Sequence, residues 1–170
     1  MDQAIIHYLR LRHGLLLGEK TAEDLKIKIG SAYKKNQISK IKSQKDEGEK
    51  AEKVMIVSGR DIETGLPKSL RVTETEIREA IGPILSQIVD GISEVVEETP
   101  PELASDILEH GIILTGGGSL LAGFDGLIVE RIKIPVTVVE DPLTTVVRGT
   151  AKLLEDKNLL DRVKVTGGLR

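Results

Sequence analysis

The stretch Ile113-Leu114-Thr115-Gly116-Gly117-Gly118-Ser119 lies in the last third of this 170-residue chain and decides its fold class. The apolar run from Ile112 to Leu114 predicts a buried strand, and the three glycines after it let the backbone turn sharply. Apolar residues after Ser119 predict that a helix begins there. Such a turn lets a flat or charged ligand approach the backbone, and the helix start offers it free N–H groups. A tight turn that holds no ligand is the alternative interpretation.

Helices and strands alternate on both sides of this glycine turn. Thr99, followed by two prolines and Glu102, predicts the start of a helix that Gly111 ends. Residues 135–139 predict a second strand, and Pro142 precedes a last helix with repeated apolar residues. The order of helix, strand, turn, helix, strand and helix predicts an α/β architecture for this third of the chain.

Two short helices are expected at the start of the chain. Asp2 is a good N-cap for an amphipathic helix that extends to residue 12. Thr21, with an acid three residues later, is a good N-cap for a second helix, which Gly30 ends. That second helix carries Glu23 and Lys26 in its first turns.

A hairpin and the longest helix are expected next. Residues 54–57 and 70–72 are mostly apolar and flank the turn residues 61–67, so they predict an antiparallel pair of strands. Thr73 and Glu76 have the spacing of a capping box and begin a long helix with apolar residues at helical spacing. We expect a kink in this helix at its internal proline.

Residues 34–53 interrupt this pattern with seven lysines and four acidic residues. The segment has no apolar periodicity that would bury one face, so it is interpreted as a solvated loop or insertion. A basic contact for a phosphate-bearing partner or an anionic membrane is the functional alternative.

Composition excludes several classes of protein. Aromatic residues make up 2% of the chain and the net charge is -3, which argues against nucleic-acid binding. Without cysteine the chain has no disulfide framework and no cysteine-based metal site, so a reducing cytoplasm is the expected location. No ligand-spaced metal cluster and no signal peptide or membrane-spanning run is predicted.

Motifs for other chemistries are also missing from the sequence. The glycine turn lacks the spacing of the dinucleotide fingerprint, and the glycines before Lys20 and Thr21 lack the spacing of a P-loop. No nucleophile elbow is present, and the three histidines are interpreted as surface or capping residues. We therefore predict no catalytic residue in this chain.

Five short motifs in a fixed order resemble one protein family. They are Met1-Asp2-Gln3-Ala4-Ile5-Ile6, Gly18-Glu19-Lys20-Thr21-Ala22-Glu23, Gly59-Arg60-Asp61 with Thr64-Gly65-Leu66-Pro67, Thr99-Pro100-Pro101-Glu102-Leu103 and Leu114-Thr115-Gly116-Gly117-Gly118. Together they resemble the C-terminal half of the MreB family, the bacterial actin homologues. The likeness covers nearly the whole chain except residues 34–53 and the last few residues. An actin-fold ATPase of the chaperone type is disfavoured by the third and fourth motifs.

The resemblance implies an actin-like fold, ATP with Mg²⁺ as the cofactor of the intact protein, and filament formation that guides cell-wall synthesis and rod shape. It implies that Glu23 and Lys26 hold the adenosine and that Gly116, Gly117, Gly118 and Ser119 cover the base and ribose. A glutamate and a lysine three residues apart point the same way from a helix, in agreement with this role.

The same resemblance places the family's phosphate loops, metal-binding aspartate, water-orienting acid and membrane-inserting segment before Met1. We therefore expect the chain by itself to be inactive as an ATPase. We also expect the strand from Ile112 to Leu114 to lack its usual neighbours and to leave apolar surface exposed.

The expected architecture is an incomplete second domain of the actin-like fold with a smaller α+β lid subdomain. Residues 1–30 and 99–158 form the core part, residues 31–98 the lid and residues 159–170 a tail. The expected function is part of a bacterial cytoskeletal filament protein that self-associates in the cytoplasm, at the inner face of the membrane in this family, and works with the cell-wall elongation machinery. The alternative is a truncated module without enzymatic activity that caps or modulates full-length filaments.

Overall fold

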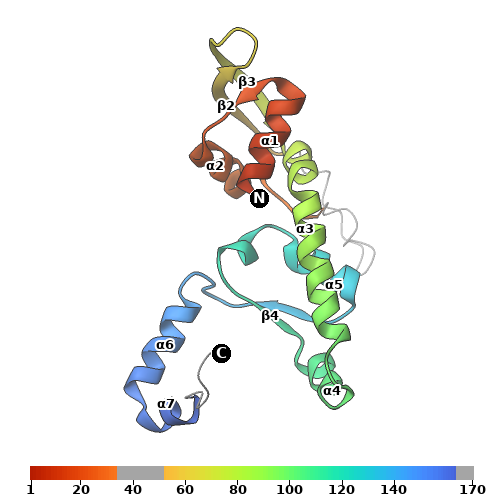
Figure 1. Ribbon diagram of the computed structural model, residues 1–170, viewed down its shortest axis with the longest axis vertical. Helices are drawn as coiled ribbons and strands as arrows, with labels where there is room; N and C mark the ends of the chain where they lie inside the picture. Colours follow the sequence, from red (N-terminus) through yellow and green to blue (C-terminus); the bar gives the residue numbers. More distant parts are fainter. Residues whose placement is uncertain (34–51, 164–170) are drawn as a thin grey trace, which may run out of the picture.

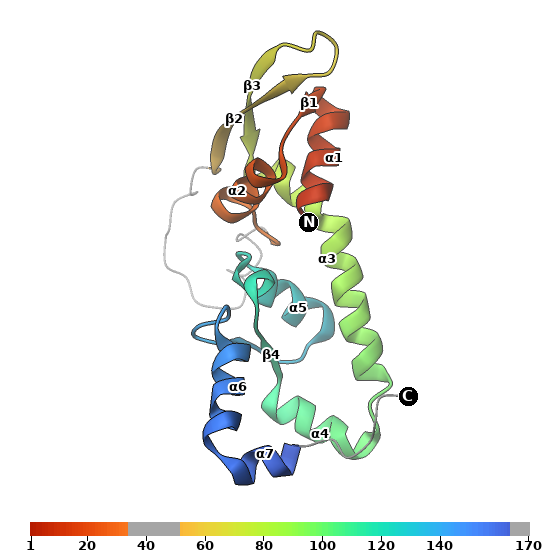
Figure 2. The same cartoon turned by 60° about the vertical axis from the view of Figure 1, so that its left-hand side comes forward.

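One long helix, α3 (Glu74–Glu97), runs along both packed parts of the chain (Figure 1). The computed structural model describes residues 1–33 and 52–163. Its first part packs around the N-terminal end of α3, and its second part lies beside the C-terminal end (Figure 2). The arrangement is mixed α/β, as the sequence predicts.

The first part consists of two helices on a three-stranded antiparallel sheet. Its elements are α1 (Asp2–His13), β1 (Leu15–Leu16), α2 (Glu19–Ile29), β2 (Val54–Asp61) and β3 (Pro67–Thr73). The strand order is β1-β2-β3, with Leu15 opposite Asp61 and Val54 opposite Thr73. The predicted hairpin is confirmed, and its strands are longer than the apolar runs because polar residues continue the ladder toward the turn.

Aliphatic side chains at helical spacing form the core of this part. In α1, Ile5 and Leu9 lie one turn apart and are fully buried. In α3 the buried residues recur at the same spacing, and Leu25 of α2 packs in the same cluster. Complete burial of each such side chain contributes about 1.5–3 kcal/mol relative to exposure, so this cluster holds the helices on the sheet.

Both N-caps predicted near the N-terminus are wrong, the first by one residue and the second by three. The N-cap of α1 is Met1, because the carboxylate of Asp2 pairs with Lys26 and makes no cap hydrogen bond. The N-cap of α2 is Gly18, whose extended backbone precedes the first helical residue, so Thr21 already lies inside the helix.

The capping box that begins α3 is confirmed. Thr73 Oγ1 accepts a hydrogen bond from the Glu76 N–H at 3.3 Å, and the Glu76 carboxylate accepts one from the Thr73 N–H at 2.9 Å. The helix continues through Pro83, which has no N–H to donate to the carbonyl of Glu79. The kink expected there stays a prediction.

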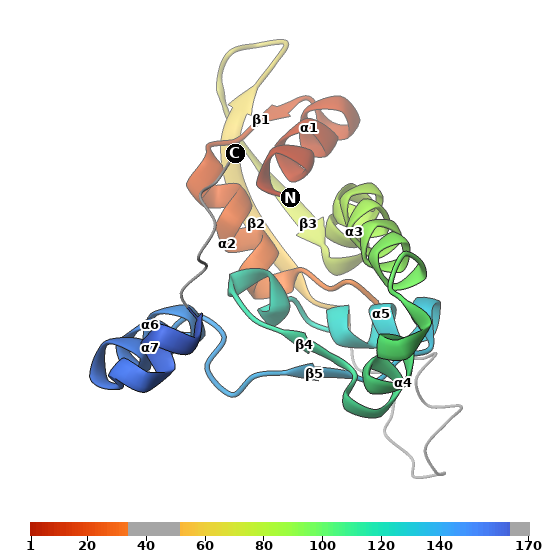
Figure 3. The ribbon, with the colours of Figure 1, turned by 60° about the horizontal axis from the view of Figure 1, so that its bottom comes forward.

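The second part is built on two parallel strands with helices around them (Figure 3). Ile112 lies opposite Val136 in the ladder. The elements are α4 (Pro101–His110), β4 (Ile112–Leu114), the 3₁₀ turn η2 (Gly117–Leu120), α5 (Phe124–Ile132), β5 (Val136–Val138), α6 (Thr145–Glu155) and α7 (Lys157–Val163). The α/β order predicted from the sequence is confirmed.

Several local predictions in this part are wrong. Thr99 does not cap α4, because its hydroxyl donates to the Val95 carbonyl at the end of α3 and Pro100 takes the N-cap position. The residues from Gly117 form a short 3₁₀ turn, and the α-helix begins at Phe124 after Gly123 has turned the chain with a φ of 75°.

The strand β4 is not buried. Ile113 is 68% exposed, and its neighbours in the strand are half-buried. Within the described part of the chain, β5 is the only strand that pairs with β4. The expectation of exposed apolar surface here is therefore met, while the expectation of a buried strand is wrong.

The packing bears on the predicted subdomains. Helices α1 and α2 both pack on α3, and α2 also packs on β2, in the same cluster as the hairpin, which favours joining residues 1–30 to the hairpin part. The division into residues 1–30 with 99–158 and a lid of 31–98 stays a prediction. Helix α7 occupies residues expected in a tail, while residues 34–51 of the charged insertion and 164–170 of the tail lie outside the described residues.

Candidate functional site

The glycine turn follows β4 and begins with a backbone conformation that favours glycine. Gly116 has a φ of 81°, in the region that side chains disfavour. Its N–H donates to the Pro142 carbonyl at 2.8 Å, and the Thr115 hydroxyl donates to the same oxygen at 3.1 Å. The carbonyl of Pro142 therefore fixes the start of the turn.

The two faces of this turn differ in how much room they leave. A Cβ atom added to Gly116 or Gly118 would meet nothing within 4 Å, whereas one added to Gly117 would lie 3.4 Å from Leu143 Cδ2. Gly117 and Gly118 are exposed. The turn thus leaves space beside its backbone, which is the property a flat ligand needs for close approach.

Ser119 is turned inward. It is buried, and its hydroxyl donates to the Gly116 carbonyl at 2.7 Å while its N–H donates to the same oxygen at 3.1 Å. These two bonds close the turn. The Ser119 side chain therefore stabilises the loop, and the backbone of the glycines remains as the surface that can face a ligand.

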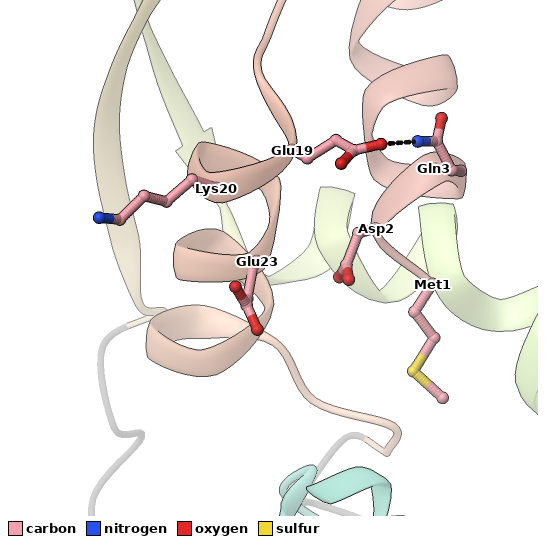
Figure 4. Close-up of a pocket in the computed structure, with 6 residues that line it drawn as sticks. All are labelled: Met1, Asp2, Gln3, Glu19, Lys20 and Glu23. Atoms are coloured by element: carbon pink, nitrogen blue, oxygen red, sulfur yellow. Dashed lines mark hydrogen bonds between the residues drawn. The ribbon is translucent and has the colours of Figure 1, made fainter.

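The predicted binding residues of α2 lie beside the start of α1. A pocket of about 550 Å³ is lined by Met1, Asp2, Gln3, Glu19, Lys20 and Glu23. Figure 4 shows the Glu23 carboxylate pointing from α2 into this space, while Lys20 points away from α1. The Gln3 amide donates to Glu19 at 2.7 Å and closes one side. Among the described residues Glu23 has no hydrogen-bond or ion-pair partner, so its carboxylate is available to a hydroxyl donor.

Lys26 is engaged within the protein. Its ammonium lies 2.8 Å and 3.1 Å from the two carboxylate oxygens of Asp2, in a half-buried ion pair that ties α2 to α1. A ligand that uses Lys26 must share it with this carboxylate. Sequence reasoning missed the pair because it interpreted Asp2 as a cap; the signal was an acid and a lysine on two adjacent amphipathic helices.

A backbone contact links α2 to the glycine turn. Ser31, two residues after the end of α2, forms a parallel bridge with Ala122, two residues after η2. The Ala32 N–H donates to the Ala122 carbonyl at 2.8 Å. The structure therefore joins the segments that carry the two predicted groups of site residues, although the pocket itself is lined by α1 and α2 residues.

Shifted ionisable groups lie away from this pocket. Burial, followed by the hydrogen bond to Glu79, raises the pKa of Tyr8 to about 12 between α1 and α3. The Lys68 ammonium and two backbone N–H groups lower the pKa of Asp61 to about 2 at the hairpin turn. Within the described ranges no group of three potential metal ligands is found. No helix there is long and apolar enough to cross a bilayer.

Comparison with known proteins shows which protein family has this arrangement. The model of the MreB/Mbl protein family matches residues 1–162. The chain belongs to the MreB/Mbl family. It is 44% identical over 154 residues to the cell shape-determining protein MreB of Escherichia coli K12, covering 91% of this chain and 40% of that protein. It is 36% identical over 165 residues to the cell shape-determining protein Mbl of Bacillus subtilis, covering 97% of this chain and 45% of Mbl. The chain thus spans less than half the length of these curated relatives.

Solved structures show the same fold. Crystal structures of MreB5 of Spiroplasma citri, one bound to AMPPNP and one to ADP, match with TM-scores of 0.79 and 0.80 at 34% identity. Each covers 96% of this MreB/Mbl chain, which covers 44% and 45% of the two MreB5 chains. A MamK double helical filament matches with a TM-score of 0.69 at 21% identity, which extends the likeness of fold. The actin-like fold expected from the sequence is confirmed.

Proposed function

We propose that this MreB/Mbl chain is part of a filament-forming, cell shape-determining protein of the bacterial cytoskeleton and supplies the adenosine side of its ATP site. The observation that carries the proposal is the match of 96% of the chain to MreB5 structures that hold AMPPNP or ADP. On this proposal the filament lies in the cytoplasm at the inner face of the membrane and works with the cell-wall elongation machinery.

The residues fit an adenosine. The available carboxylate of Glu23 can accept a hydrogen bond from a ribose hydroxyl. Lys26 lies one turn further along the same helix, where it pairs with Asp2 and can also donate to the purine edge. The glycine turn offers backbone and open space against which a ribose and base can lie. ATP supplies the phosphates and, with Mg²⁺, the hydrolytic chemistry, which residues outside this chain would support.

The direct test is a nuclear magnetic resonance titration of the 170-residue chain with ATP and with adenosine. We expect the amides of residues 23–26 and 116–119 to shift with one shared dissociation constant, weaker than about 100 µM because half a site gives less than roughly -5.5 kcal/mol. Glu23→Ala should abolish saturation, while Lys28→Ala, an exposed lysine on the same helix, should leave it unchanged.

Two results would contradict the proposal in different ways. Binding tighter than about 100 µM would show a self-sufficient nucleotide module. Shifts that do not saturate at about 10 mM nucleotide, or that spare both groups of residues, would remove the nucleotide role from this chain.

A replacement experiment tests the filament and cell-shape part. The matched 154-residue segment of E. coli MreB is exchanged for the corresponding residues of this chain. Cells that depend on the chimera should stay rod-shaped, and Glu23→Ala in the chimera should round them. Glu109→Ala, an exposed acid on α4, serves as the control. Round cells at normal chimera levels would count against the proposal.

A second candidate function is a module that caps or modulates filaments of a full-length relative. It is favoured by the exposed apolar edge at Ile113. Added below stoichiometry to a polymerising relative, a capping chain should lower the mass of sedimented filaments. A chain that acts only within its own protein should leave that mass unchanged.

A further inference from the structure

A polar cluster of one buried and two half-buried side chains lies where the two parts of the molecule meet. Ser31 is 4% exposed, and its hydroxyl donates to Glu74 Oε1 at 2.7 Å. The same hydroxyl oxygen accepts hydrogen bonds from Arg78 Nε at 3.1 Å and from Arg78 Nη2 at 3.0 Å. Arg78 Nη2 also lies 2.9 Å from Glu74 Oε1, so the three side chains form a closed triangle.

This triangle anchors a backbone segment that connects α2 to the glycine turn. Glu74 and Arg78 lie one turn apart on α3, and Ser31 lies in the segment that leaves α2. The backbone of Ser31 bridges to Ala122, and the Ala32 N–H donates to the Ala122 carbonyl. Ala122 follows η2 directly through Leu121, which is itself in the core.

Close contacts leave this connection little freedom on either side. A Cβ atom on Gly30 would lie 2.2 Å from the Lys26 carbonyl oxygen, so the chain leaves α2 packed against its last turn. A Cβ atom on Gly123, whose φ is already 75°, would lie 3.1 Å from the Cβ of Tyr33. A displacement of Ser31 would therefore also displace the end of α2 and the segment that follows η2.

From this geometry we infer that Ser31, Glu74 and Arg78 form a positioning node that sets the spacing between α2 and the glycine turn. The node touches neither Glu23 nor the glycines, so it acts on the adenosine site through the backbone. The spacing role stands on the structure, and its use in nucleotide binding rests on the proposed function. Because the hydrogen bonds to Ser31 come from a charged guanidinium and are mostly buried, their loss is not readily compensated by water.

The spacing is measured with two spin labels on the full chain. The chain contains no cysteine, so Lys28→Cys on α2 and Leu120→Cys at η2 give two unique, exposed attachment points. We expect a narrow distance distribution in the parent, and a broad or displaced one when Ser31→Ala or Arg78→Ala is added. The two substitutions together should broaden it by less than the sum of the single effects, because both remove the hydrogen bonds between Arg78 and Ser31.

A matched control separates the effect of breaking the node from the effect of removing any arginine that contacts α3. Arg12 also reaches α3, where its guanidinium lies 3.9 Å from Glu79, but its partners do not include Ser31. Arg12→Ala should leave the label distribution narrow. Hydrogen exchange gives a second readout: Ser31→Ala should speed exchange of the Ala32 amide about tenfold, with little change at the Ile112 amide, which donates to Pro135.

The effect of the node on nucleotide binding is measured with the adenosine titration. Ser31→Ala should weaken the shared binding of adenosine several-fold, because the two groups of binding residues are then less well positioned relative to each other. Unchanged distances and exchange in Ser31→Ala would overturn the node. A broadened distance with unchanged adenosine affinity would overturn its role in positioning. If the parent binds no adenosine, the proposed function fails while the distances still decide the spacing.

Discussion

At the scale of single residues, the end of α2 depends on the absence of a side chain at Gly30. Its φ of -67° is ordinary, so the requirement comes from space: an added Cβ would lie 2.2 Å from the backbone oxygen of Lys26. Gly30→Ala must push the chain away from the helix and should destabilise the protein by about 1–3 kcal/mol, measured by urea unfolding.

Gly91 provides the control for that substitution. It lies exposed inside α3, and an added Cβ there meets nothing within 4 Å. Gly91→Ala should stabilise the protein by about 0.5–1 kcal/mol, because alanine loses less backbone freedom in a helix. A Gly30→Ala protein as stable as Gly91→Ala would contradict the close packing at the end of α2.

The hairpin turn gives a residue-scale prediction about pH. Asp61 bonds to the Lys68 ammonium, 2.8 Å away, and accepts the N–H groups of Thr64 and Glu63; together these lower its pKa from 3.8 to about 2. A lowered pKa in the folded protein means that the carboxylate stabilises the fold fully above pH 3.8 and loses that contribution as the pH falls toward 2.

Carboxyl chemical shifts measure this directly. The Asp61 titration should have its midpoint near pH 2 in the parent chain, and Lys68→Ala should raise it toward 3.8. Asp61→Asn should lower stability at pH 7 and have a much smaller effect at pH 2, where about half of the parent carboxylate is already protonated. Equal losses of stability at both pH values would show that packing, and not the charge of Asp61, causes the loss.

At the scale of helices and strands, prediction from sequence worked where one local interaction decides the boundary. The box of Thr73 and Glu76 begins α3 as expected, and the turn of Asp61 closes the hairpin. It failed where another partner competes for the same side chain. Asp2 binds Lys26 on another helix, and the Thr99 hydroxyl bonds back to Val95, so neither acts as a cap.

The start of α3 can be tested by removing its cap. Thr73→Ala leaves the Glu76 N–H without its acceptor and should cost about 1 kcal/mol of stability. Thr99→Ala removes a hydroxyl that caps no helix and should cost less than about 0.5 kcal/mol. Both are measured by thermal unfolding. Equal costs would show that the box contributes no more than an ordinary exposed threonine.

At the scale of the whole molecule, the contact between the segments that carry the two groups of expected site residues was not predicted from the sequence. The family resemblance pointed to Glu23 and the local pattern pointed to the glycines, and the binding role of both stays a prediction. Ser31 and Ala122 have no such signature, since two small residues form a backbone bridge only when the fold brings them together. The prediction that β4 is buried was wrong for a similar reason. An apolar run indicates that a strand can be buried, but it does not indicate which segments pack against it.

The exposed apolar surface of helix α6 leads to the last prediction. Helix α6 has no buried residue, and Val146 is 73% and Leu154 76% exposed. Exposed apolar surface on this scale favours association, so the mass of the chain in sedimentation equilibrium should rise with concentration. Val146→Glu with Leu154→Glu should keep it monomeric at unchanged thermal stability, because exposed sites contribute little to folding. Arg148→Glu, exposed on the same helix, changes the net charge equally without removing apolar surface. If it disperses the chain as well as the double substitution does, charge and not apolar contact drives the association.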